Sequence, residues 1–201
     1  MQLFKLFLHD EPKKKAVERW VKTYGKELYR FAVLRVSSRE EAEDLLQQTF
    51  LNAYSSFDKL AAGTNEKAWL YTILTNVIRD HLTKLSRRPV TMSLQDSDAV
   101  DELGDIKANP EQQLSLKMDL EELSVALASL PEPFVVPLLM HEVGNMKYDE
   151  ISKSLDIPVG TVMSRLYRAR KALFEMLVAK TGTDKKRMSK IIKGGEDDGL
   201  R

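Results

Sequence analysis

Polar and basic side chains recur at helical spacing between residues 161 and 171, and together they could bind DNA. One side of this segment is apolar, because Val162, Leu166 and Ala169 follow one another at intervals of four and three residues. Arginine on the other side could bond to guanine and to phosphates in the major groove. The segment predicts a DNA-reading helix, and a basic face that is merely solvated is the simpler alternative. The candidate DNA-binding residues are Thr161, Ser164, Arg165, Tyr167, Arg168 and Lys171.

The residues before this segment predict a shorter helix and a tight turn. Ile151 and Leu155 place apolar groups on one face of residues 148–155. A turn is expected at Asp156, and Pro158 suits the first turn of the next helix, where no N–H is needed. Two short helices around a tight turn, the second basic on its outer face, are typical of a helix-turn-helix.

Residues 157–170 read Ile-Pro-Val-Gly-Thr-Val-Met-Ser-Arg-Leu-Tyr-Arg-Ala-Arg. This string closely resembles the recognition helix of region 4 in sigma factors of bacterial RNA polymerase, above all in the small extracytoplasmic-function (ECF) group. The resemblance implies that the helix reads the −35 promoter element as a duplex. Two positions depart from the family pattern. Met163 stands where many relatives have a basic residue, and Lys147 stands where a Ser or Thr commonly caps the first helix of the motif. Asp149 and Glu150 in the first turn of that helix would offset part of the lost cap.

A second polar face is predicted on a helix over residues 66–86. A tryptophan beside an amide and a guanidinium suits stacking on an unpaired base and bonding to its edge. The alternative is a tryptophan at the boundary of the core, folded under the preceding loop. Projected at about 100° per residue, the side chains of this face span about 100°; they are Trp69, Thr72, Asn76, Arg79 and Asp80.

Residues 68–80 resemble sigma regions 2.3 and 2.4, which open the −10 element and read one of its strands. The loop over residues 59–65 corresponds to the family's loop that holds a flipped-out base. The resemblance therefore implies that the polar face of residues 66–86 binds the −10 element.

An acidic and amide-bearing surface is predicted on residues 42–54. These residues resemble sigma region 2.2, which docks on the coiled-coil clamp helices of the polymerase β′ subunit. Carboxylates and amides can pair with a basic partner helix, and exposure to solvent is the alternative. Further partners that the resemblance implies are the polymerase β flap, promoter DNA and an anti-sigma protein. The expected core-polymerase contacts are Glu43, Asp44, Gln47, Gln48 and Phe50.

Helical periodicity runs through the chain and strand signals are nearly absent, so the expected fold class is all-α. Residues 13–88 predict one domain of three amphipathic helices around a shared core. Ser38 and Glu41 predict a capping box at the start of its second helix.

Two small helical domains joined by a flexible linker are therefore expected. Residues 89–109 lack an apolar stripe and are rich in aspartate, which predicts a flexible acidic linker. A helix restarts at Asn109 and Pro110 and opens the second domain, residues 110–179. Residues 180–201 are predicted to be disordered.

Composition excludes several classes of protein. The 201 residues carry a net charge of only +1, so any signal for nucleic acid must be local. Cysteine is absent and the three histidines are isolated in sequence, so no cofactor and no metal site are expected. No Gly-rich phosphate loop or nucleophile–base constellation indicates an enzyme. Neither a membrane-spanning run nor a signal peptide is recognisable, which predicts a cytoplasmic protein without membrane insertion.

The function predicted from these features is that of a sigma factor, which binds core RNA polymerase and directs it to promoters. A stand-alone helix-turn-helix transcription regulator is the main alternative, and it would bind promoter duplex tightly by itself. A helical adaptor that binds only protein would leave Arg165, Arg168 and Lys171 without a role.

Overall fold

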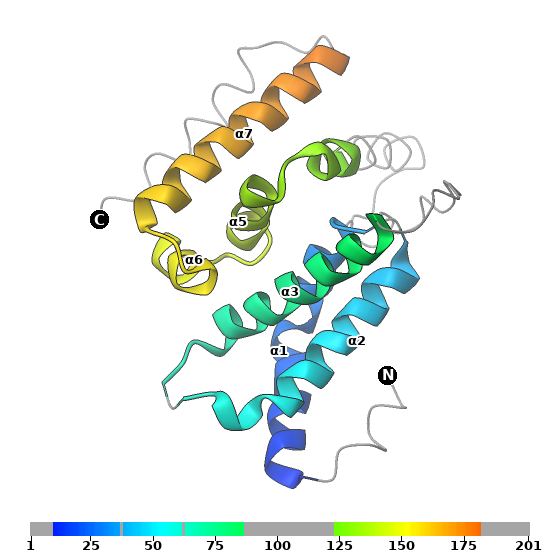
Figure 1. The fold of residues 1–201 in the computed structure, drawn as a ribbon, viewed down its shortest axis with the longest axis vertical. Coiled ribbons are helices and arrows are strands. Elements are labelled where there is room, and N and C mark those ends of the chain that lie inside the picture. Colours follow the sequence, from blue (N-terminus) through cyan, green and yellow to red (C-terminus); the bar gives the residue numbers. More distant parts are fainter. Residues whose placement is uncertain (1–9, 37, 62, 87–122, 182–201) are drawn as a thin grey trace, which may run out of the picture.

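The computed structural model describes residues 10–36, 38–61, 63–86 and 123–181, and every regular element within these ranges is a helix. This confirms the predicted all-α class. The N-terminal group, in the lower half of Figure 1, comprises α1 (Glu11–Val33), α2 (Arg39–Ser55), the short 3-10 helix η2 (Phe57–Lys59) and α3 (Glu66–Ser86). The C-terminal group, in the upper half, comprises a helix over 123–129, α5 (Glu132–Glu142), α6 (Tyr148–Leu155) and α7 (Val159–Thr181).

Side-chain caps determine where the first three helices begin. Asp10 accepts from the Lys13 N–H at 3.5 Å at the start of α1. Ser38 accepts from the Glu41 N–H at 3.1 Å, which confirms the Ser38 half of the capping box predicted for α2. Asn65 accepts from the Ala68 N–H at 3.1 Å and begins α3. Each cap satisfies a backbone donor that has no partner inside its helix.

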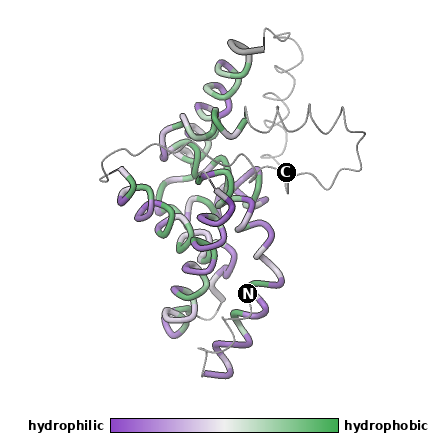
Figure 2. Tube along the Cα trace, turned by 90° about the vertical axis from the view of Figure 1, so that its right-hand side faces the viewer, coloured by the Kyte–Doolittle hydropathy of each residue, from purple (hydrophilic) through white to green (hydrophobic). Residues whose placement is uncertain are grey.

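The core of the N-terminal group is built from aromatic and aliphatic side chains that face inward from all three helices. Hydrophilic and hydrophobic residues alternate along much of the helical tube in Figure 2, as amphipathic helices require. Trp20, Phe31, Leu70, Tyr71 and Leu74 are completely buried. Leu85 is 40% exposed, because it lies near the end of α3, beyond the core.

The C-terminal group contains the predicted helix-turn-helix. Between α6 and α7 the backbone turns at Asp156, which has a φ of 51° in the left-handed region. The Ser152 hydroxyl donates to the Ile157 carbonyl at 2.6 Å and closes this turn. Pro158 directly precedes α7, and its carbonyl accepts from the Val162 N–H at 3.1 Å.

The two groups pack against each other through α3 and α6. Tyr71 of α3 is completely buried and reaches the turn after α5. A Cβ at Gly144 would come within 2.8 Å of the Tyr71 ring, so the close approach depends on glycine at this position. Buried residues of both groups consequently form one continuous hydrophobic cluster. We call this packing of α3 against α6 the closed arrangement.

Several predictions concern residues outside the described ranges. The linker over 89–109, the helix start at Asn109 and most of the predicted tail over 180–201 are among them. α7 continues through Thr181, two residues beyond the end expected for the second domain. Among the described residues, no helix combines the length and the apolar character that crossing a bilayer requires.

Candidate nucleic-acid interface

The outer face of α7 presents polar and basic side chains to solvent. Val162, Leu166 and Ala169 are buried and attach the helix to its own group. On the other side Ser164, Arg168 and Lys171 are exposed, and Tyr167 is 57% exposed. Thr161 is half-buried at the edge of this face. The helix thus presents hydroxyl, guanidinium and ammonium groups as a DNA-reading helix does.

Arg165 differs from the other predicted residues of α7. It is half-buried and lines a cleft between the two groups together with Arg79 of α3, Glu132 of α5 and Leu155 of α6. Helical spacing places Arg165 closer to the buried side than Arg168, which accounts for this position. The structure therefore separates Arg165 from the freely exposed face.

Two further contacts orient the helix-turn-helix. Arg170 of α7 donates to Glu142 of α5 at 2.8 Å and fixes the two helices against each other. The Glu150 carboxylate accepts from the Lys147 backbone N–H at 2.8 Å. This bond satisfies one donor at the start of α6, where lysine has no acceptor to offer, as expected from the acidic first turn.

The polar face of α3 is only partly open to solvent. Asn76, Arg79 and Asp80 are exposed, whereas Thr72 is half-buried. Trp69 is also half-buried and contacts Trp20 edge-to-face, with ring centroids 5.5 Å apart. Trp69 therefore sits at the boundary of the core, as one of the two interpretations of the sequence expected.

Four polar contacts attach this face to the C-terminal group. The Thr72 hydroxyl lies 3.1 Å from the Ser154 carbonyl, and the Ser154 hydroxyl donates to the Ala68 carbonyl at 2.9 Å. The Asn65 amide donates to Glu150 at 2.7 Å. Arg79 donates to Glu132 at 2.8 Å. Two of the residues predicted to bind the −10 element are therefore held by the other group.

Two residues of α3, Glu66 and Tyr71, have side chains whose pKa differs from the ordinary value. Arg19 donates two bonds to Glu66, at 2.8 and 2.6 Å, and holds the pKa of this carboxyl below its usual range. The carboxylate therefore stays charged in the first turn of α3, where the helix dipole favours it. Burial raises the pKa of Tyr71, whose hydroxyl has no hydrogen-bond partner among the described residues.

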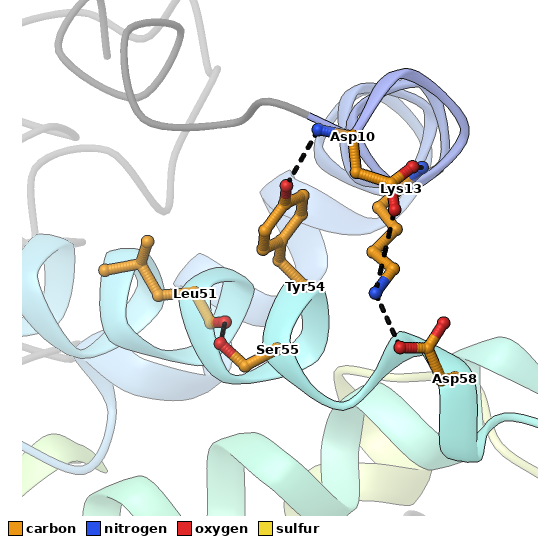
Figure 3. Close-up of polar contacts among 6 residues, drawn as sticks. All are labelled: Asp10, Lys13, Leu51, Tyr54, Ser55 and Asp58. Atoms are coloured by element: carbon orange, nitrogen blue, oxygen red, sulfur yellow. Dashed lines mark hydrogen bonds and ion pairs between the residues drawn. The ribbon is translucent and has the colours of Figure 1, made fainter.

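The outer face of α2 carries the predicted acidic and amide groups. Glu43, Asp44, Gln47 and Gln48 are all exposed. The end of α2 and the following η2 are tied to the start of α1 in Figure 3: the Tyr54 hydroxyl of α2 accepts from the Asp10 N–H at 3.1 Å, and Lys13 pairs with Asp58 of η2 at 2.6 Å. This tie orients α2 in the N-terminal group.

Comparison with known proteins gives the same division into two parts. The family model described as Sigma-70 region 2 matches residues 20–88, and the model described as Sigma-70, region 4 matches residues 120–173. The ECF RNA polymerase sigma-E factor of Haemophilus influenzae is 31% identical over 145 residues, which cover 69% of this chain and 76% of the relative. The chain belongs to the sigma-70 family, in its ECF group. Proteins of this family are regulatory DNA-binding proteins that direct RNA polymerase to promoters.

Further similarities agree with this family. The ECF RNA polymerase sigma-E factor of Escherichia coli K12 is 31% identical over 138 residues, which cover 66% of this sigma factor and 72% of the relative. A solved structure of CnrH in complex with the cytosolic domain of CnrY has a TM-score of 0.63 at 20% identity, and covers 84% of this chain and 91% of that one. The sigma factor RpoE, in complex with the anti-sigma factor NepR from Bartonella quintana, has a TM-score of 0.63 at 24% identity, with coverages of 83% and 99%. These two likenesses show the fold.

One residue expected on the polymerase-binding face of this sigma factor was placed wrongly. Phe50 is only 3% exposed and packs in the core, so its ring cannot contact a partner directly. Leu51 was missed, although it lies four residues after Gln47 and is 37% exposed on the same outer face. Helical spacing alone could have found Leu51. The partners Ser154 and Glu132 could not be found this way, because their contacts join residues far apart in sequence.

Proposed function

We propose that this sigma factor binds core RNA polymerase through α2, reads the −10 element with α3 and reads the −35 duplex with α7. The observation that carries the proposal is the exposed polar face of α7 on a helix-turn-helix, together with a second polar face on α3. The −35 residues are Thr161, Ser164, Arg165, Tyr167, Arg168 and Lys171. The −10 residues are Trp69, Thr72, Asn76, Arg79 and Asp80.

The polymerase-binding surface in this proposal is the outer face of α2. Glu43, Asp44, Gln47 and Gln48 would face the β′ clamp helices, and their exposure supports this role. Exposed Leu51 adds an apolar contact at the middle of the face. Phe50 supports the helix from beneath. The C-terminal group would meet the β flap.

The closed arrangement has a consequence for how the proposed surfaces work. Thr72 and Arg79 are held by Ser154 and Glu132, so the C-terminal group covers part of the −10 surface. Binding of a single strand to α3 therefore requires the two groups to separate. The domains over residues 13–88 and 110–179, joined by the linker over 89–109, would allow this movement.

The proposed partners and place of action follow from the same function. An anti-sigma protein that binds and stabilises the closed arrangement would keep the −10 surface covered. Catalysis belongs to the polymerase in this proposal, and the sigma factor works in the cytoplasm beside it.

Transcription in vitro tests the proposal directly. Purified core polymerase is incubated with a library of promoter sequences, with and without this sigma factor. We expect promoter-specific transcripts only when it is added. We also expect the free protein to bind promoter duplex weakly and with strong salt dependence. Tight sequence-specific binding by the protein alone, without an effect on transcription, would support the stand-alone regulator instead.

A further inference from the structure

The exposed large apolar side chains of the described residues gather on the first turns of α7. Val159 is 41% exposed, Met163 is 53% exposed and Tyr167 is 57% exposed. They lie at intervals of four residues and form one stripe that spans about 80° of the helix. The other exposed large apolar residues in the described ranges, Leu51, Leu85 and Val125, lie on three different helices.

Polar and basic groups border this apolar stripe. Ser164, Arg168 and Lys171 are exposed on the adjoining part of the same face. Lys171 makes a 3.9 Å ion pair with Glu175 of its own helix, and both side chains remain more than half exposed. Cationic groups beside an apolar stripe favour a polyanion that also displays apolar groups, which describes the major groove of DNA.

The position of the stripe along the helix matters as well. In a helix-turn-helix, the N-terminal part of the second helix contacts the base edges. Met163 is the fifth residue of α7, so it falls in this part. Thymine displays a methyl group in the major groove, and apolar side chains recognise it by contact. Methionine is flexible and polarizable, and it adapts its shape to such a group.

We infer that Met163 and Tyr167 read thymine in the −35 duplex through apolar contact with its 5-methyl group, with Val159 at the edge of the contact. The inference rests on the proposed reading of the −35 element by α7. It adds a preference of this sigma factor for T·A pairs at the positions that these side chains face. Arg168 and Lys171 hold the neighbouring phosphates or guanine.

Removal of single methyl groups from the DNA tests the inference. Promoters selected with core polymerase and this sigma factor provide the −35 duplex. Each of its thymines is replaced in turn by deoxyuridine, which lacks the methyl and keeps every base-pairing group. At one or more positions we expect the holoenzyme to bind about fourfold more weakly, the effect of one buried methyl-sized group.

The same replacement is then made with variant proteins. In Met163→Ala we expect the deoxyuridine effect to disappear at the thymine that Met163 contacts, because the contacting side chain is gone, whereas a thymine that Tyr167 contacts should keep its effect. Val125→Ala is the matched control, since Val125 is 58% exposed and lies on the helix over 123–129, and it should keep the full effect. Met163→Gln gives a second test that retains the length of the side chain, and circular dichroism confirms that each variant is folded.

Four other outcomes would overturn the inference. If no thymine is sensitive to methyl loss, or if the penalty persists at every sensitive thymine in both Met163 variants, promoter-specific transcription remains and only the methyl contact of Met163 is removed. A Met163→Ala defect that is equal on thymine and deoxyuridine templates would show that Met163 supports binding through a contact other than the thymine methyl group. Failure to obtain any promoter-specific transcript would remove the proposed function and this inference with it.

Discussion

The outer face of α7 and the polar face of α3 carry similar kinds of side chain in different surroundings. On α7, Tyr167 and Arg168 are exposed in the closed arrangement. On α3, Thr72 contacts Ser154, and Arg79 pairs with Glu132 of the other group. In the closed arrangement the outer face of α7 is therefore open to solvent, and the polar face of α3 is partly covered by the C-terminal group.

This difference bears on how one small protein could recognise duplex DNA with α7 and single-stranded DNA with α3 in separate steps. In the proposed function a duplex binds the exposed face of α7, which is open without rearrangement except at Arg165 in the cleft. In the proposed function a single strand binds Thr72 and Arg79 of α3, which contact Ser154 and Glu132 of the other group, and this binding requires the closed arrangement to open. The comparison thus predicts that locking the molecule affects the two surfaces unequally.

The largest effect is expected from a covalent lock. Because the chain has no cysteine, Thr72→Cys and Ser154→Cys can be joined selectively by a short thiol crosslinker. We expect the crosslinked sigma factor with core polymerase to lose promoter opening, measured by permanganate reactivity of unpaired thymines. Binding of an isolated −35 duplex should be unchanged, because the outer face of α7 lies outside the lock.

The controls for this lock separate closure from chemical damage. The double variant without crosslinker tests the substitutions themselves, and Thr72→Cys that carries only half of the linker tests the bulk of the adduct. Both should open promoters better than the crosslinked protein. If the crosslinked protein opens promoters as well as these controls, the closed arrangement does not restrict the −10 surface.

Substitution of the −10 residues should produce the next largest effect. Base stacking on an aromatic ring is worth about 1–3 kcal/mol, so Trp69→Ala should reduce opening about tenfold or more. This variant also loses the contact with Trp20, and we expect its free energy of unfolding to fall by about 1–3 kcal/mol. Asn76→Ala separates the two effects. Because Asn76 is exposed, this variant should impair recognition of the −10 element without loss of stability. Normal opening by a folded Asn76→Ala would remove this residue from the −10 surface.

Local patterns predicted the elements of this protein well. The third helix was expected over residues 66–86, and α3 is Glu66–Ser86. Ser38 caps α2, and the turn at Asp156 lies between the two helices of the helix-turn-helix. These features depend on residues close in sequence, so spacing and capping chemistry are enough to find them.

The errors and omissions come from side-chain packing and from long-range contacts. Phe50 lies near the edge of the apolar stripe, where helical spacing cannot say whether a large ring turns inward, and the core of the N-terminal group buries it. Arg165 lies at a similar edge of α7 and faces the cleft between the groups. The bond from Asn65 to Glu150 joins residues 85 positions apart, which no periodicity reports.

A smaller effect is expected at the open surface. Arg168→Ala should weaken recognition of the −35 duplex by about 1–3 kcal/mol if one bidentate contact is lost. Because α7 is exposed in the closed arrangement, we expect the same loss in the crosslinked and the unlinked protein. Fluorescence anisotropy with a labelled −35 duplex measures both. Lys153→Ala is a suitable control, since Lys153 is an exposed cation on α6. A loss that depends on the crosslink would show that α7 also requires opening.

The smallest effect concerns the ion pair that closes the cleft. The Arg79 and Glu132 side chains are 51% and 36% exposed, and an exposed pair of this kind contributes about 0.2–1 kcal/mol. Glu132→Gln should therefore shift the molecule only modestly toward the open state, and high salt should do the same to the wild type. Glu142→Gln is the matched control, because Glu142 pairs with Arg170 inside the C-terminal group. Single-molecule FRET between dyes at Lys22→Cys and Glu175→Cys measures the open fraction. Equal open fractions in the two variants would mean that the ion pair adds nothing to closure, and that the hydroxyl contacts of Thr72 and Ser154 and the buried Tyr71 account for it.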